Sequence, residues 1–245
     1  MKKNVILVIL VCFALVNIMK APALASTVVT TGAGYKTMLE ELCKAFRESG
    51  GTVEEMYGGT IGQMLAQIRQ GSDVNVIVSD IGTLEAMSQG VEFDFYESLG
   101  DTPLVLAWRK GIDIKSPGDL ENDEVKSVCH PDAQAAIYGR AASQFLESSG
   151  IGKKIENKLS VVTLVPQVFA YLSSGEMDAG FVNRVMILNG SDKLGGWLEI
   201  TEGYPPISMV AAVLKGNGGD PQVVQFVEFL RSEEGKAILK KNGVW

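Results

Sequence analysis

Four turns in the chain place glycine, alanine, valine or a hydroxyl residue where a strand-like run gives way to a helical pattern. The first turn follows the run 27–31 at Gly34, and the others lie near Thr60, Ala135 and Val165. The first N–H groups of a helix have no partner within that helix, so each turn can donate hydrogen bonds to an anion. If the four helix starts converge, they predict a site for a dehydrated anion held without a formal positive charge.

The first of these turns matches no nucleotide-binding motif. The third glycine position of a dinucleotide fingerprint holds Thr37, and the chain contains no Gly-Lys-Ser/Thr of a P-loop. Gly32 and Gly34 could also serve only a tight turn, which is the more common role of such glycines. The turn is therefore informative only together with the rest of the chain.

Residues that could carry out catalysis are scarce. His130, just before a proline, is the single histidine, and no Gly-x-Ser-x-Gly elbow is present. Histidines, cysteines and carboxylates do not cluster with the spacing of metal ligands. Cys43 and Cys129 could form a disulfide in an oxidising compartment, although we favour two buried free thiols. We therefore expect a binding protein and not an enzyme, with no cofactor and no metal site.

Residues 1–25 have the pattern of a secretory signal peptide. Two lysines precede an apolar run over 5–16, and a small-x-small signal predicts cleavage before Ser26. The run is too short to span a membrane. Cys12 lies inside it, which argues against a lipoprotein. We expect a secreted, periplasmic protein, and a retained N-terminal anchor is the alternative.

The charge of the chain excludes one class of partner. The formal net charge is −7 at pH 7, and three of the 22 basic residues lie in the predicted leader, so the rest of the chain is more acidic still. A protein that binds nucleic acid is usually basic. We therefore expect no nucleic-acid partner.

Strand-like and helix-like segments alternate through the chain, which predicts α/β lobes with parallel, doubly wound sheets. Continuous apolar runs over 74–78, 104–108 and 179–182 are typical of strands buried on both faces. Further strands are expected over 27–31, 52–56, 125–129, 159–164 and 207–214, and helices around 38–46, over 63–70, up to about 148, and over 167–173, 222–230 and 232–241.

Four segments, 71–79, 175–182, 204–216 and 226–243, resemble in order the periplasmic molybdate-binding proteins of ABC importers. One departure in them is Asn75, where the family pattern has aspartate. The resemblance implies the type II periplasmic binding protein fold. That fold has two lobes, each a mainly parallel sheet flanked by helices, with the ligand in the interlobe cleft.

The resemblance also implies how the chain divides. We place the two crossings between lobes near Leu106 and Tyr204. Lobe one is then 26–106 plus 204–245, and lobe two is 107–203. Such lobes close around their ligand by hinge motion.

The ligand site implied by the resemblance combines hydroxyl groups and main-chain N–H groups. The family has a serine in the first turn, a serine in the second, and a tyrosine after the strand 179–182. Here these places hold Gly34, Thr60 and Asn183. The ligand-binding residues expected in this way are Gly34, Tyr35, Thr60, Ile61, Ala135, Val165 and Asn183.

Several of these positions have an alternative role. Thr60 could be a plain helix cap, Asn183 a turn residue, and Tyr35 a packing residue. Losing a hydrogen bond to a buried anion costs about 1.5–3 kcal/mol, which Tyr35 or Asn183 could restore from a new position. If the site has changed ligand, Lys36 or Arg184 could supply a positive charge, although a solvated surface position is more common for both. The remaining polar residues at helix starts, Gln134 and Gln167, could simply face solvent.

The sequence thus predicts a monomeric solute-binding protein that delivers molybdate or tungstate to a membrane permease of an ABC importer. Two alternatives remain open. The same fold could bind another small anion or a polar organic solute, or it could report ligand to a sensory receptor.

Overall fold

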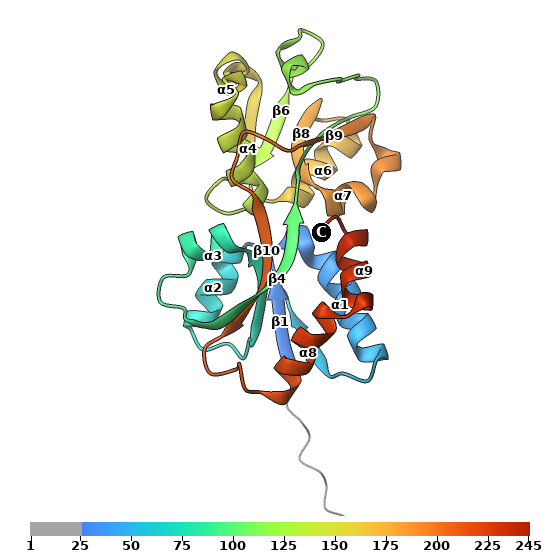
Figure 1. Ribbon diagram of the computed structural model, residues 1–245. Helices are drawn as coiled ribbons and strands as arrows, with labels where there is room; N and C mark the ends of the chain where they lie inside the picture. The colour runs from blue at the N-terminus through green and yellow to red at the C-terminus, as the bar shows by residue number, and fades with distance from the viewer. Residues whose placement is uncertain (1–25) are drawn as a thin grey trace, which may run out of the picture.

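The structure, a computed structural model, describes residues 26–245 as two lobes joined end to end (Figure 1). The predicted signal peptide, residues 1–25, lies outside the described residues. Within the described part of the chain, no helix is both long enough and apolar enough to cross a membrane.

Lobe one is built on a five-stranded sheet with the order β2-β1-β3-β10-β4, in which β10 alone runs against the other strands. Helices α1, α8 and α9 cover one face, and α2 and α3 cover the other (Figure 1). The strands are β1 (Thr27–Thr31), β2 (Val53–Met56), β3 (Val76–Asp80), β4 (Phe93–Thr102) and β10 (Ile207–Leu214); the helices are α1 (Lys36–Glu48), α2 (Ile61–Arg69), α3 (Ile81–Met87), α8 (Pro221–Arg231) and α9 (Glu233–Lys241).

Lobe two repeats this plan with the order β7-β6-β8-β5-β9, and here β5 runs against the others. The mainly parallel sheets predicted for both lobes are therefore confirmed. The strands are β5 (Leu104–Trp108), β6 (Val128–Pro131), β7 (Leu159–Val162), β8 (Ala179–Asn183) and β9 (Gly196–Ile200); the helices are α4 (Ile137–Ser148), α5 (Ile151–Lys154), α6 (Val165–Ser174) and α7 (Arg184–Leu188).

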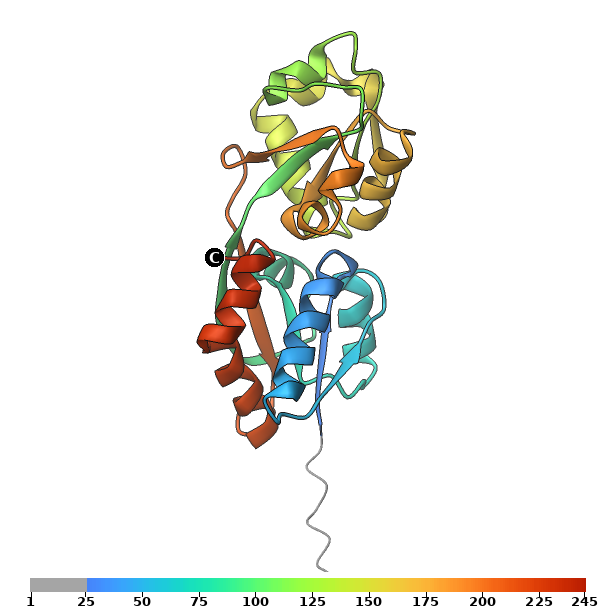
Figure 2. The ribbon, with the colours of Figure 1, turned by 90° about the vertical axis from the view of Figure 1, so that its right-hand side faces the viewer.

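The chain passes between the sheets twice, at Pro103 and between Ile200 and Ile207. Both crossings lie on one side of the molecule (Figure 2). Because β5 lies whole in the second sheet, residues 104–106, assigned from the sequence to lobe one, pair with lobe two. The Tyr204 hydroxyl ties the crossings together: it accepts from the N–H of Leu104 at 2.7 Å and donates to the Ile200 carbonyl.

The strands with continuous apolar runs are the buried ones. Every residue of β3, β5 and β8 is buried, as expected for strands covered on both faces. In contrast, β4 alternates between exposed and less exposed residues along most of its length and lies at the sheet edge, paired with β10 alone. Because β4 contains many polar residues, the sequence pattern predicted no strand there.

The bounds of β3 and β6 differ from the prediction because pairing, not hydropathy, determines them. The strand β3 continues past Val78 to Asp80, since Ser79 and Asp80 pair with β10. The strand β6 begins at Val128 and continues to Pro131, in register with β7. Val125, predicted to begin that strand, is buried outside it.

Each lobe contains one buried cysteine within the described residues. Cys43 lies in α1 of lobe one, and Cys129 lies in β6 of lobe two. Both are free thiols, which confirms the preferred interpretation of the sequence.

Candidate functional site

The four turns singled out in the sequence meet at one cavity between the lobes. In both sheets, the parallel strands end at turns that open helices, and four of these turns line a cavity of about 30 Å³. A single buried water needs about 10–15 Å³, so the cavity suits a small, compact solute. The lining residues are Gly32, Ala33, Gly34, Tyr35, Gly59, Thr60, Ile61, Ala135, Ala136, Ile137, Tyr138, Leu164 and Val165.

All the predicted site residues except Asn183 line this cavity. Asn183 is fully buried at the end of β8 and caps α7, because its Oδ1 accepts from the N–H of Met186 at 3.0 Å. Its Nδ2 donates across to lobe one, to the Gly34 carbonyl at 2.7 Å. A Cβ at position 34 would lie 3.2 Å from that nitrogen. Glycine at position 34 therefore leaves the space that the Asn183 amide needs to join the two lobes.

Thr60 caps α2 and still retains a proton to donate. Its Oγ1 accepts from the N–H of Gln63 at 3.2 Å, and the Gln63 side chain accepts from the N–H of Thr60 at 2.9 Å. A hydroxyl offers one donor as well as two acceptor sites. The capping role and an anion-binding role, treated as alternatives from the sequence, are therefore compatible at Thr60.

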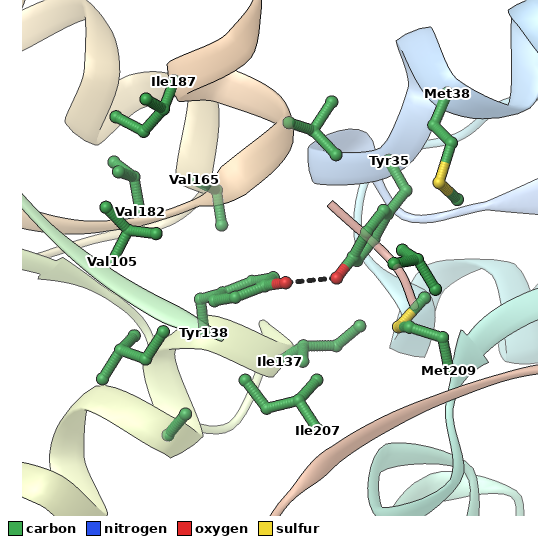
Figure 3. Close-up of a cluster of buried hydrophobic side chains, with 14 of the residues drawn as sticks. Tyr35, Met38, Val105, Ile137, Tyr138, Val165, Val182, Ile187, Ile207 and Met209 are labelled. Carbon is green, nitrogen blue, oxygen red and sulfur yellow. Dashed lines mark hydrogen bonds between the residues drawn. The ribbon is translucent and has the colours of Figure 1, made fainter. Parts of the chain in front are cut away.

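A chain of three hydroxyl groups crosses between the lobes at the cavity. Tyr35 from lobe one and Tyr138 from α4 share a hydrogen bond through their hydroxyl groups (Figure 3). The Tyr138 hydroxyl also lies 3.1 Å from Thr102 Oγ1. If Thr102 donates to Tyr138 and Tyr138 donates to Tyr35, the Tyr35 proton is left for a ligand. Both tyrosines are almost completely buried.

The two tyrosines are hydroxyl donors at any physiological pH. Burial is the largest cause that raises the pKa of Tyr35 and that of Tyr138, so neither ionises near neutrality. Tyr138 was missed in the sequence. Its place in the first turn of the helix that follows Ala135 is the feature that could have identified it, since it brings a hydroxyl group to a predicted anion site.

The cavity lining contains no charged side chain. Lys36 is half-exposed, lies 3.5 Å from Glu40 and approaches the ring of Tyr57. Arg184 pairs with Glu199 and stacks over Trp197 and Trp245. Neither cation reaches the cavity.

The other polar residues considered from the sequence also lie outside the lining. Gln134 is exposed, and the Gln167 side chain bonds the N–H of Thr163 and the Tyr171 hydroxyl. His130 lies at the end of β6, where its Nδ1 donates to the Pro131 carbonyl at 2.7 Å. Burial lowers the pKa of His130, so it is neutral at pH 7 and has a structural role.

The donors that remain around the cavity suit a fully deprotonated anion. Ile61, Ile137 and Val165 are the first residues of α2, α4 and α6, so their N–H groups have no acceptor within those helices. Hydroxyl groups of Thr60 and Tyr35 add to them. Without a carboxylate in the lining, the cavity offers no strong acceptor for a proton on the ligand.

Comparison with known families agrees with this architecture. Residues 27–244 match the family described as bacterial extracellular solute-binding proteins. The match spans nearly all the described residues.

Individual relatives have the same overall length and fold. A molybdate-binding protein of Rhodobacter capsulatus is 26% identical over 236 residues, covering 94% of this chain and 92% of that protein. The periplasmic molybdate-binding protein of Azotobacter vinelandii superposes with a TM-score of 0.77 at 24% identity, covering 90% of this chain and 99% of that one. PEB3 of Campylobacter jejuni, solved with L-phospholactate, superposes with a TM-score of 0.71 at 17% identity, covering 89% and 98%.

Proposed function

Because this chain belongs to the bacterial extracellular solute-binding protein family, we propose that it captures a small tetrahedral oxyanion, molybdate or tungstate, for an ABC importer. It is a solute-binding protein and not an enzyme. One observation carries the choice of ligand: four helix starts and three hydroxyl residues surround a small cavity whose lining has no charged side chain.

In this mechanism, the anion is held by hydrogen bonds alone. It enters between the separated lobes and meets the N–H groups at the starts of α2, α4 and α6 together with the Thr60 hydroxyl. The lobes then close about the crossings at Pro103 and 201–206, and the Tyr35 hydroxyl completes the donors. Hydrogen bonds to a charged group contribute about 1.5–3 kcal/mol each, so a few of them can replace the water shell of the ion.

The same lining gives a reason for selectivity. Phosphate carries a proton in part of its population at neutral pH, and that proton needs an acceptor which the lining does not supply. A phosphorylated carboxylate such as the ligand of PEB3 carries an additional charged group, and the cavity lining offers no cation to pair with it. We therefore place molybdate and tungstate ahead of these ligands.

The rest of the function follows the family. The protein is exported by the predicted signal peptide, cleaved before Ser26, and works as a periplasmic monomer. It closes on its ligand by hinge motion between the two lobes, about the crossings at Pro103 and 201–206, and then docks on a membrane permease.

A thermal melting experiment on ligand-stripped protein tests the proposal. The panel holds molybdate, tungstate, sulfate, phosphate, phospholactate and citrate. A ligand at 100 times its Kd stabilises the folded state by about 2.7 kcal/mol, and we expect such a shift in Tm with molybdate and tungstate. If folded, ligand-free protein responds to an organic anion and to neither metal oxyanion, the proposed ligand is wrong.

A further inference from the structure

One ion pair joins the two lobes beside the cavity without lining it. Asp80 ends β3 in lobe one, and its Oδ2 pairs with the guanidinium of Arg140 from α4 in lobe two. Arg140 also donates through Nη1 to Thr83 Oγ1 at 2.8 Å. Within residues 26–245, the other ion pairs each join residues of the same lobe. Asp80–Arg140 is named here the interlobe ion pair.

The Asp80 carboxylate depends on this partner. Its side chain is 2% exposed, Oδ1 has no hydrogen-bond partner, and Oδ2 otherwise accepts only from the N–H of Thr83 at 3.1 Å. Leaving a buried charge without its partner is strongly unfavourable. If the lobes separate, Arg140 moves away and water must replace it. Closure therefore exchanges water for a guanidinium group held by two acceptors of lobe one.

Arg140 links the interlobe ion pair to the cavity, because its helix α4 also carries residues of the cavity lining. It lies near the start of α4, two residues after the cavity residue Tyr138 and three after Ile137. Gly82 lets the two helix starts approach, since a Cβ there would lie 3.3 Å from Arg140 Nη2 and 3.3 Å from Asp80 Oδ2. The Arg140 side chain is 28% exposed, so it retains part of its hydration and its desolvation cost is reduced.

We propose that Arg140 is a positioning residue for ligand retention. The interlobe ion pair, together with the hydrogen bond from Arg140 to Thr83, holds α4 closed over the cavity without touching the ligand. This inference rests on the proposed function only for the measurement of ligand dissociation, which uses molybdate. Closure of the ligand-free protein is a separate property of the interlobe ion pair. The pair holds the lobes together both with and without ligand, so its loss should raise the dissociation rate and should not lower the association rate.

Three variants test this inference. Arg140→Gln removes the charge, Arg140→Lys retains it, and Arg231→Gln breaks the pair with Glu97 inside lobe one as a matched control. Small-angle X-ray scattering of ligand-free protein measures lobe separation. We expect a larger radius of gyration for Arg140→Gln than for wild type, an intermediate or restored value for Arg140→Lys, and no change for Arg231→Gln.

Stopped-flow kinetics with molybdate gives the second readout. We expect dissociation from Arg140→Gln to be about tenfold faster than from wild type. If Arg140→Gln fails to fold, Asp80→Asn carries the same test, because asparagine still caps α3 while losing the charge.

The outcomes separate this inference from the proposed function. A radius of gyration for Arg140→Gln equal to that of wild type and of Arg231→Gln overturns the inference, whatever ligand binds. Failure of every metal oxyanion to bind overturns the proposed ligand, and the scattering result still decides the role of the interlobe ion pair.

Discussion

At the scale of single residues, Thr60 combines a structural contact with a proposed ligand contact. Its hydroxyl oxygen accepts from the N–H of Gln63 and caps α2, while its proton is left to donate into the cavity. A substitution that keeps the cap and changes the charge separates the two roles, since aspartate caps helices as well as threonine does.

For Thr60→Asp we therefore expect nearly unchanged stability and loss of oxyanion binding, because a carboxylate in the cavity repels an anion. Thr60→Ser, which keeps both the cap and the donor, is the control and should bind within a few-fold of wild type. Urea denaturation measures the free energy of unfolding, and isothermal titration calorimetry with molybdate measures Kd. Undiminished binding by Thr60→Asp would remove Thr60 from the site.

Asp178 anchors lobe two and should make its stability depend on pH. Its carboxylate accepts from the Nε of Arg109 at 2.6 Å and from the N–H groups of Lys126 and Ser127 at 2.6 and 3.1 Å. Burial alone would raise the pKa of Asp178, but these hydrogen bonds outweigh it and lower the pKa below its ordinary value. The contribution of the Asp178 carboxylate to the free energy of unfolding is thus complete above the unfolded pKa of about 3.9. It is lost as pH falls through the lower folded pKa.

We expect Asp178→Asn to lower the free energy of unfolding by about 2 kcal/mol at pH 7, and by less at pH 3, below the unfolded pKa. Urea denaturation at both pH values measures the difference in the free energy of unfolding between wild type and Asp178→Asn. Asp113→Asn, at an exposed ion pair with Lys115, serves as the control with little effect at either pH. If Asp178→Asn lowers the free energy of unfolding by the same amount at pH 7 and pH 3, this account of Asp178 is wrong.

At the scale of elements, the start of α4 is held closely against the end of β6. A Cβ on Gly139 would lie 2.3 Å from the Asp132 carbonyl oxygen and 2.4 Å from that of Pro131. These are backbone atoms, so no side-chain rotation relieves the contact. Glycine is therefore required at this position by close packing and not by an unusual backbone conformation.

We expect Gly139→Ala to destabilise the protein by about 1–3 kcal/mol and to weaken oxyanion binding, because the first turn of α4 must shift away from the cavity. Gly219→Ala is the control: nothing lies within 4 Å of its Cβ, so stability should change by less than about 0.5 kcal/mol. Chemical denaturation and calorimetry check both effects. Equal stability of the two variants would contradict this expectation, because it would show that the backbone near Asp132 moves to admit the new Cβ at little cost in free energy.

The sequence predicted most elements because buried parallel strands and amphipathic helices leave strong patterns. It identified the turns at Gly34, Thr60, Ala135 and Val165, since a strand end followed by a helix start is a local feature. It failed at β4, whose polar edge residues resemble a loop, and at the ends of β3 and β6, where pairing with distant strands decides the boundary.

At the scale of the whole molecule, the contacts between lobes were beyond the reach of sequence patterns. The hydrogen bond from Asn183 to Gly34, the hydroxyl pair of Tyr35 and Tyr138, and the ion pair of Asp80 and Arg140 each join residues far apart in the chain. Nothing local in the sequence relates these partners, because their distance depends on how the two lobes face each other. Asn183, expected from the sequence to contact ligand, bonds the Gly34 carbonyl of the opposite lobe.

The two buried cysteines give each half of the molecule its own chemical reporter. Only an accessible thiolate reacts with an alkylating reagent, and burial raises the pKa of Cys43 strongly and that of Cys129 to about 12. Labelling must therefore wait for unfolding around each residue. With Cys43 in one lobe and Cys129 in the other, peptide mass spectrometry after timed alkylation distinguishes a molecule whose lobes unfold together from one whose lobes unfold independently, in a single sample and without an engineered probe.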